Sequence, residues 1–241
     1  MVRGGMMEII KAFATTNTTY LKCREIKFIS IHYDAGTSSR AGTAKSLAAW
    51  FKAGANPANP ASSDFIVDDA SVVQYNPDIE NRYTWCVGGS KYGKVSTSLG
   101  GRLYGIAKNS NCINIEIKSN KTNKKSLNAD DKDWYFTDAA LNNAAELVRY
   151  LMEKYNIPAE NVIMHHEVTG KLCPAMWCHD ESELQGWYDF KKKLLAAPAD
   201  AEGDVLYYVQ VGAFSSRDNA EAYLAKVKMD YPGAFIKVMK G

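Results

Sequence analysis

The segment that decides the fold and the site is Val162-Ile163-Met164-His165-His166-Glu167-Val168-Thr169-Gly170-Lys171-Leu172-Cys173-Pro174. It begins as a short apolar run, which predicts a buried strand, and continues into a loop that carries an imidazole, a carboxylate, an ammonium and a thiol. His165 and Cys173 are residue types that bind zinc, and the loop between them is long enough for both side chains to reach one ion. Two ligands do not complete a zinc site, so a third must come from a distant part of the chain.

A second apolar run, Ile26 to Ile31, predicts another buried strand, and His32 follows directly at its end. Side chains at strand ends are well placed for binding, because the sheet fixes the backbone while the loop can approach a ligand. A histidine in isolation would more often be a hydrogen-bonded structural residue, but beside the later segment His32 is favoured as the third ligand. His179 competes with His165 for the same role, and His166 is expected to support the site or to be structural.

The run from Ser110 to Ile117 alternates isoleucines with polar side chains, which predicts a strand with one apolar and one polar face. Glu116 lies on the polar face of this strand. An exposed face or a salt bridge would explain a carboxylate there, and so would a catalytic role.

These separated motifs, together with Tyr83 to Gly89, resemble the zinc-dependent N-acetylmuramoyl-L-alanine amidases of the phage-lysozyme type, which are related to peptidoglycan recognition proteins. The resemblance covers roughly residues 20–196. It implies an α/β fold with a mixed central β-sheet flanked by helices. It also implies a Zn²⁺ cofactor that lowers the pKa of its water toward ~7. The residues implied are His32, His165 and Cys173 as zinc ligands, Glu116 as the general base, and Lys171 as a positive charge facing the oxyanion.

The chain departs from the family pattern at three positions. Asp64 stands where the family commonly has a histidine, and Ser63 where some relatives have a catalytic tyrosine, so no acid–base tyrosine is carried over. Cys86 replaces another histidine of the family, which puts a substrate-contact role at this position in doubt. The substrate contacts that the resemblance does imply are Tyr33, Trp85 and Thr169.

The remaining periodicity predicts the elements around these motifs. They are a helix over 43–52, a hairpin over 62–75 with its turn at 68–71, a long loop at the rim of the site over 90–108, a solvated polar excursion over 118–132, a helix over 138–152 with Thr137 as its N-cap, and a helix over 183–196.

The C-terminal segment has a different character. Residues 198–203 have the composition of a linker, which leaves residues 1–197 as the catalytic domain. Residues 204–241 resemble one β-α-β half of the sporulation-related (SPOR) repeat, with strands expected at 205–214 and 234–238 and a helix at 219–229. The resemblance implies binding to peptidoglycan glycan, through Gln210 and Phe214. About 35 residues are too few for an independent core, so we expect this half-module to form a homodimer or to pack on the catalytic domain.

Composition limits the alternatives. The net charge of +2, without a block of like charge, argues against nucleic acid as a partner. No apolar run is long enough to span a membrane, and no secretory signal is recognised at the start. The five cysteines without such a signal favour a reduced compartment, although a Cys173–Cys178 disulfide is conceivable.

The sequence therefore predicts a phage or prophage endolysin, made in the host bacterial cytoplasm and acting on the cell wall after release. Two alternatives stay open. A non-catalytic recognition protein would commonly lack the cysteine ligand, whereas Cys173 is present. A structural zinc protein would fill the fourth position with His179 or Cys178.

Overall fold

The computed structural model describes residues 8–195 and 214–230. The chain divides into two compact units, Met1–Pro198 and Ala199–Gly241. In the second unit the described element is the helix α5 (Arg217–Asp230), which overlaps the helix predicted at 219–229. The predicted linker at 198–203, the predicted strand at 234–238, Gln210 and nearly all of the strand predicted at 205–214 lie outside the described residues. No helix in the described ranges has the length and apolarity that a membrane span requires.

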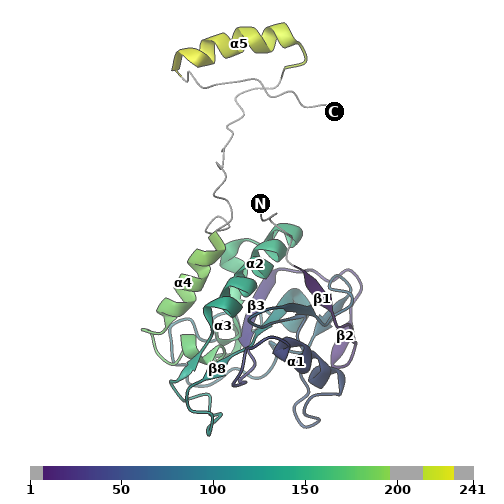
Figure 1. Ribbon diagram of the computed structural model, residues 1–241, viewed down its shortest axis with the longest axis vertical. Coiled ribbons are helices and arrows are strands. Elements are labelled where there is room, and N and C mark those ends of the chain that lie inside the picture. Colours follow the sequence, from purple (N-terminus) through teal and green to yellow (C-terminus); the bar gives the residue numbers. More distant parts are fainter. Residues whose placement is uncertain (1–7, 196–213, 231–241) are drawn as a thin grey trace. The chain divides into compact units, whose positions relative to one another are not determined.

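A six-stranded mixed sheet forms the centre of the first unit (Figure 1). Its order is β1-β5-β4-β7-β3-β10, and only the β4–β5 pair is antiparallel. The bounds of its strands are β1 Ile9–Lys11, β3 Phe28–Tyr33, β4 Phe65–Val67, β5 Val72–Gln74, β7 Cys112–Ile117 and β10 Val162–Met164. Two further strand pairs lie outside it, β2 (Thr18–Tyr20) with β6 (Arg82–Thr84), and β8 (Asn120–Lys121) with β9 (Trp134–Tyr135).

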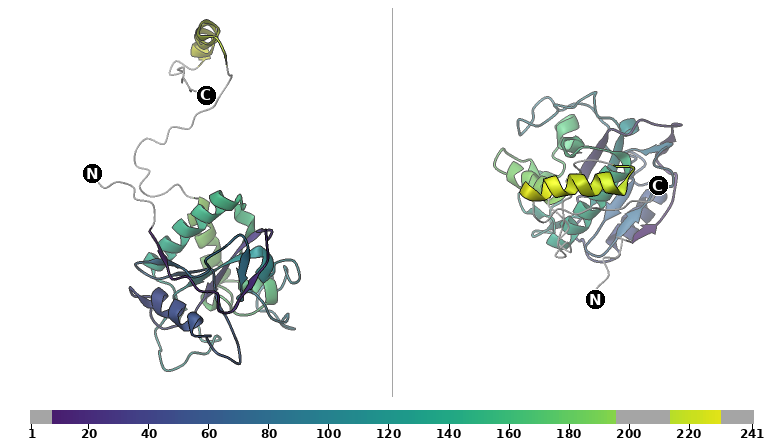
Figure 2. Two further views of the ribbon diagram at one scale, coloured as in Figure 1. Left: turned by 90° about the vertical axis from the view of Figure 1, so that its right-hand side faces the viewer. Right: turned by 90° about the horizontal axis from the view of Figure 1, so that it is seen from above.

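One face of the sheet packs on α2 (Asp138–Tyr155) and α4 (Leu184–Leu195), which bury a common core with alternate residues of the strands. These strand residues include Ile29, Ile31, Ile113, Ile115 and Ile117, all fully buried. Burial of such aliphatic side chains stabilises the fold by roughly 2 kcal/mol each. α1 (Thr43–Lys52) packs on the opposite face over β4 and β5, and the left view of Figure 2 shows this helix on the side away from α2. His32 of β3 and Glu116 of β7 lie on this same face of the sheet.

The predicted elements are largely observed. The helix predicted at 43–52 is α1, and the hairpin at 62–75 is the β4–β5 pair. Thr137 caps α2 as expected, because its side chain accepts a hydrogen bond from the N–H of Ala140.

Parts of the structure differ from the sequence prediction. β1 and β2 have no counterpart among the predicted elements, because each has only three residues, two half-buried and one exposed, which is too short to show the alternation of a strand. The polar excursion at 118–132 is not fully solvated, since Lys121 is buried and its ammonium pairs with Asp131 and Asp133.

The segment after β10 also differs, because a loop was expected and a short helix forms. This helix, α3 (His165–Thr169), ends at Gly170, whose φ is +86°. A side chain there would be strained by that φ and would also meet Val95, since an added Cβ would lie 2.6 Å from the Val95 Cγ1 atom. Residues 8–195 also contain three short 3₁₀ helices, at Asn109–Asn111, Ala159–Asn161 and Ala175–Trp177.

Candidate metal centre and catalytic site

The candidate site lies at the carboxyl ends of three adjacent parallel strands, β7, β3 and β10. His32 of β3 and Glu116 of β7 are paired in register. Side chains alternate between the two faces of a strand, and Ile31 and Ile115 enter the core under α2. His32 and Glu116 therefore share the opposite face, where no helix of the α2–α4 layer covers them.

His165 and Cys173 reach the same place from β10 and the loop that follows it. His165 is the first residue of α3, directly after the strand. The loop turns back on this helix, because the N–H of His166 donates to the carbonyl of Cys173 at 2.9 Å. The Cys173 Sγ atom consequently lies 3.8 Å from Nδ1 of His32.

The three groups make a compact donor set. The candidate ligand atoms of His32, His165 and Cys173 all lie within 4.8 Å of one another, and all three side chains are buried. The two imidazole rings are 4.9 Å apart in a T-shaped arrangement. The Nε2 atom of His165 is buried and has no hydrogen-bond partner among the described residues. Two imidazoles and one thiol, with a buried ring nitrogen that lacks a partner, fit a tetrahedral zinc ion that keeps one position open.

A chain of buried hydrogen bonds fixes which nitrogen of His32 is available. Thr84 Oγ1 donates to the Asp64 carboxylate at 3.0 Å, so it accepts at 3.1 Å from Nδ2 of Asn114. The Asn114 Oδ1 atom then faces His32 Nε2 at 3.3 Å, and a carbonyl oxygen can only accept. The proton of the neutral ring is therefore on Nε2, and Nδ1 presents its lone pair toward Cys173.

Burial also sets the protonation of the donors. It lowers the pKa of His32 to about 3, with the Lys171 charge as a second cause, and it lowers the pKa of His165 well below its ordinary value. Both imidazoles are therefore neutral at pH 7, as ligands must be. Burial raises the pKa of the Cys173 thiol to about 12. A metal ion that binds there must displace the thiol proton.

Glu116 lies beside these donors as a strongly perturbed carboxyl group. Burial, and secondly the charge of Asp34, raise its pKa to about 7. Its Oε2 atom is buried and lacks a partner in the described part of the chain, whereas Oε1 lies 3.5 Å from the Cys86 thiol. Lys171 stands at the rim, and the charges of Cys173 and Glu116 raise its pKa. A carboxyl group that titrates near neutral pH is suited to proton transfer.

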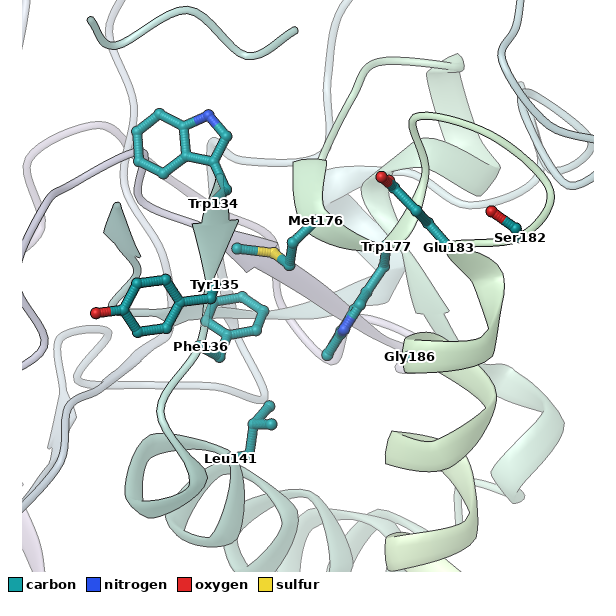
Figure 3. A pocket seen from close by; sticks show the side chains of 9 residues that line it. All are labelled: Trp134, Tyr135, Phe136, Leu141, Met176, Trp177, Ser182, Glu183 and Gly186. Carbon is teal, nitrogen blue, oxygen red and sulfur yellow. The ribbon is translucent and has the colours of Figure 1, made fainter. Parts of the chain in front are cut away.

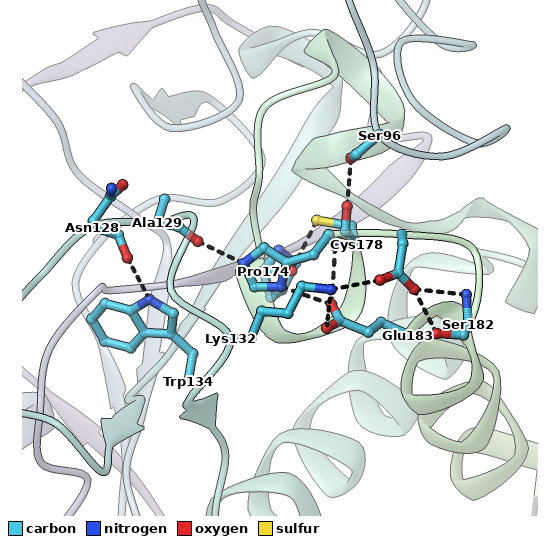
Figure 4. A network of polar contacts seen from close by, with 11 residues as sticks. Ser96, Asn128, Ala129, Lys132, Trp134, Pro174, Cys178, Ser182 and Glu183 are labelled. Carbon is cyan, nitrogen blue, oxygen red and sulfur yellow. Dashed lines mark hydrogen bonds and ion pairs between the residues drawn. The ribbon is translucent and has the colours of Figure 1, made fainter.

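The competing histidines are occupied elsewhere. His166 contacts the Lys171 carbonyl through Nδ1 at 2.9 Å and the Thr97 hydroxyl through Nε2 at 2.8 Å. His179 contacts the Glu183 carboxylate and the Ala129 carbonyl, each at 2.7 Å, in a network of which Figure 4 shows Ala129 and Glu183. Neither ring has a free nitrogen for a metal ion, so the arrangement favours His165.

Both cysteines of the conceivable disulfide are free. The Cys178 thiol donates to the Pro174 carbonyl at 3.1 Å. The disulfide considered for this pair is therefore not formed.

The expected substrate contacts lie around the site with very different exposure. Trp85 is 37% exposed, and its Nε1 donates to the Thr19 hydroxyl. Tyr33 is only 7% exposed and packs edge-on against the Trp134 ring. Thr169 is 2% exposed, but it lines a hollow together with Tyr83, Gly88, Tyr104 and Lys108. Trp85 is the most accessible of the three expected contacts.

A second hollow lies between β9, the start of α2 and α4, and is shown in Figure 3. Aromatic and thioether side chains line it, among them Tyr135, Phe136, Met176 and Trp177. Its carboxylate, Glu183, is already bound by His179. None of the candidate site residues lines this hollow.

Sequence reasoning missed the residues that support the site. Asp64 was identified only as a departure from the family, yet it is fully buried and anchors the hydrogen bonds that reach His32. Thr84 and Asn114 gave a single signal, which is a polar side chain within an apolar strand environment. Their hydrogen-bond partners come from segments far apart in the sequence, so this signal could not assign a role to either residue.

Comparisons with known proteins agree with this geometry. Residues 22–176 match the family model described as N-acetylmuramoyl-L-alanine amidase, and residues 191–241 match that of the SPOR domain. The chain is 35% identical over 86 residues to the N-acetylmuramoyl-L-alanine amidase CwlL of Bacillus licheniformis, which covers 34% of this chain and 23% of that protein. It is 32% identical over 147 residues to the amidase CwlH of Bacillus subtilis (strain 168), which covers 61% and 46%. The matched part thus spans less than half the length of either relative.

Solved structures show the same fold. PlyL is similar with a TM-score of 0.52 and 26% identity, over 78% of this chain and 97% of that one. The catalytic domain of XlyA is similar with a TM-score of 0.52 and 27% identity, over 78% and 99%. A mutant endolysin from Bacillus subtilis has a TM-score of 0.51 and 28% identity, also over 78% and 99%.

Proposed function

The chain belongs to the N-acetylmuramoyl-L-alanine amidase family, and from this premise we propose that it is a zinc-dependent peptidoglycan hydrolase. The bond cleaved is the amide between N-acetylmuramic acid and L-alanine. The observation that carries the proposal is the meeting of His32, His165 and Cys173 beside the partly buried carboxyl group of Glu116.

The residues have distinct roles in this reaction. His32, His165 and Cys173 would hold zinc, which when bound supplies a Lewis acid that polarises the scissile carbonyl and acidifies the attacking water. Glu116 takes the proton of that water, and its pKa of about 7 lets it accept a proton near neutral pH and return it to the leaving amine. Lys171 directs a fixed positive charge at the developing oxyanion, a role usually worth ~3 kcal/mol.

Substitution of Glu116 tests the assignment of the base. Glu116→Gln should retain bound zinc, because the three donors are untouched, and should lose wall lysis by roughly 10²- to 10⁴-fold. Bound metal is measured on the purified protein, and lysis by the clearing of cell-wall suspensions. The new amino termini should be those of L-alanine.

The control variant is Glu146→Gln, on the exposed face of α2, which should lyse walls like the wild type. Normal lysis by Glu116→Gln would refute the base. Digestion that releases new reducing sugar ends instead of L-alanine amino termini would refute the amidase itself.

A non-catalytic peptidoglycan-binding protein is the alternative function. The buried donor set with its orphaned His165 nitrogen favours the enzyme, because binding alone gives no reason to place a titratable carboxyl group beside three metal ligands. A protein that binds walls but releases no L-alanine amino termini, with zinc present, would support the alternative.

We further propose that the whole chain acts on the bacterial cell wall as an endolysin of phage or prophage origin. Its similarity to the endolysin from Bacillus subtilis supports this setting. The SPOR match over residues 191–241 supports a tail that holds the enzyme on the wall. Glycan contacts at Gln210 and Phe214, a homodimer through the half-module, and release from the host cytoplasm stay predictions.

A further inference from the structure

The Cys86 thiol occupies a defined position next to the candidate base. Its Sγ atom lies 3.5 Å from Oε1 of Glu116. The backbone around it is held firmly, because the N–H groups of Cys86 and Val87 both donate to Oδ1 of Asn109, at 3.0 and 2.8 Å. Cys86 is partly exposed.

Cys86 is part of a second set of potential metal ligands. The ligand atoms of His32, Cys86 and Glu116 all lie within 4.8 Å of one another. Independently of the thiol, Oε2 of Glu116 is buried without a hydrogen-bond partner in the described ranges. An imidazole, a thiolate and an unsatisfied carboxylate are together a donor set for a thiophilic divalent cation.

We propose that Cys86 and Glu116 form a second, inhibitory metal position, adjacent to the His32–His165–Cys173 set, for a thiophilic divalent cation such as Zn²⁺ or Cd²⁺. Binding replaces the thiol S–H bond by a sulfur–metal bond and releases the proton to solvent. The ion occupies the carboxylate that would otherwise accept a proton during amide cleavage. This inhibitory effect rests on the function proposed above, but the binding does not.

His32 links the two positions. Its Nε2 atom is directed at Asn114, so Nδ1 is the nitrogen left for a metal ion, and it can serve only one ion at a time. When the first set is filled, the second position has two protein ligands, Cys86 and Glu116, and binds more weakly. When the first set is broken, His32 completes the second.

Cadmium titration tests the binding directly. The titration uses a Cys23→Ser background, because the exposed Cys23 thiol would bind the probe. Thiolate-to-cadmium absorption and bound-metal analysis should show two ions per chain, and one ion after Cys86→Ser. One ion in both proteins, with identical absorption, would overturn the proposal.

A second variant uses the sharing of His32. Cys173→Ser, in the same background, should still bind one Cd²⁺ with thiolate absorption, now through His32, Cys86 and Glu116. The further change Cys86→Ser should remove both the absorption and the ion. Absence of thiolate absorption in Cys173→Ser alone, with helical circular dichroism unchanged, would contradict the proposal.

Lysis in excess Zn²⁺ tests the inhibition. Excess zinc should slow lysis by ~10²-fold in the Cys23→Ser protein, which is the loss expected when a general base is blocked. The slowing should be absent after Cys86→Ser, each protein being compared with itself at stoichiometric zinc. Equal slowing in both would contradict an inhibitory role. If neither protein cleaves walls, the proposed function fails while the cadmium stoichiometry still decides the second position.

Discussion

At the scale of single residues, the site concentrates groups whose charged forms are poorly solvated. Burial and the Asp34 charge raise the pKa of Glu116 from 4.5 to about 7, and burial lowers the pKa of His32 from 6.5 to about 3. A folded protein holds such groups only at a cost in stability, which is a mark of functional sites. The cost is measurable because it depends on pH.

Metal-free Glu116→Gln should be more stable than the metal-free wild type at pH 8. The folded wild type must there ionise a carboxyl group whose folded pKa is raised, at a cost on the order of 3 kcal/mol. As pH falls through 7 the folded state binds a proton that the unfolded state does not, so the advantage of the variant shrinks and disappears near pH 4.5. Urea unfolding at pH 5 and pH 8 measures both ends of this window.

The same titrations on Glu146→Gln provide the control, since that side chain is exposed on α2. A pH-independent difference between Glu116→Gln and the wild type would show that the Glu116 carboxyl group is not perturbed in the folded protein.

Thr84→Val should weaken zinc binding by roughly 10- to 100-fold, the range typical of groups that support a metal ligand. The change removes the hydroxyl that orients the Asn114 amide. The Asn114 oxygen then no longer holds the proton of the His32 ring on Nε2, so Nδ1 is less often free to bind the metal ion. Competition with a chromogenic chelator measures the affinity.

Thr97→Val is the matched control for this prediction. It removes another buried hydroxyl, but one that contacts the ring of His166, and that ring contacts the Lys171 carbonyl through its other nitrogen. Equal losses of affinity in Thr84→Val and Thr97→Val would mean that general destabilisation, and not ring orientation, weakens binding.

These residue-scale features differ in how far the sequence predicts them. His32, His165 and Cys173 each follow a strand or belong to a dense motif, so residue type, order and the family resemblance single them out as candidates. Asn114 and Thr84 act through partners that only the folded sheet brings together. The helix α3 was also missed, because five residues are too short for a periodic signal.

At the scale of elements, α3 and the loop at 90–108 stabilise each other. A helix leaves its last carbonyl groups without intrahelical partners. Here the loop supplies them, because the N–H groups of Tyr92, Gly101 and Leu103 donate to carbonyls of α3 at 2.7 to 2.9 Å. The rim loop that the sequence predicted is therefore anchored on the helix that begins with His165.

Arg102→Met should detach part of this loop. Arg102 pairs with the carboxylate of Glu167, which is 1% exposed and also accepts from the N–H of Met164. Loss of the ion pair leaves the buried Glu167 carboxylate with one partner fewer, which is destabilising. Because half of the Arg102 side chain is solvent-exposed, the expected decrease in the free energy of unfolding is only about 1–2 kcal/mol. Urea unfolding gives the loss, and the amides of Gly101 and Leu103 should exchange hydrogen faster.

Arg40→Met, at an exposed position before α1, controls for the loss of a surface charge. Unchanged exchange at Gly101 and Leu103 in the Arg102 variant would show that the backbone hydrogen bonds hold the loop without the ion pair.

At the scale of the whole molecule, the sheet order explains why residues distant in sequence form one site. β3 lies between β7 and β10, although it precedes both by many residues. Parallel pairing brings the carboxyl ends of all three strands to one edge, where His32, Glu116 and His165 meet. The two compact units of the chain suggest that catalysis and wall attachment can be separated.

Removal of residues 198–241 should therefore leave cleavage of soluble muropeptides unchanged, because the donor set and the sheet lie within residues 8–195. Binding to intact cell walls should weaken by ~10²-fold if the tail adds a second attachment. Within the full chain, Phe214→Ala should weaken wall binding in the same direction, since Phe214 is 46% exposed and its ring lies against Tyr223.

Trp50→Ala is the matched control, because Trp50 is 47% exposed but belongs to α1 of the first unit. Co-sedimentation with purified walls measures attachment, and analytical ultracentrifugation of the full and shortened chains tests the predicted homodimer. A shortened chain that sediments with walls as well as the full chain would assign attachment to the catalytic unit. If the full and the shortened chain both sediment as monomers, the predicted homodimer through the half-module is refuted.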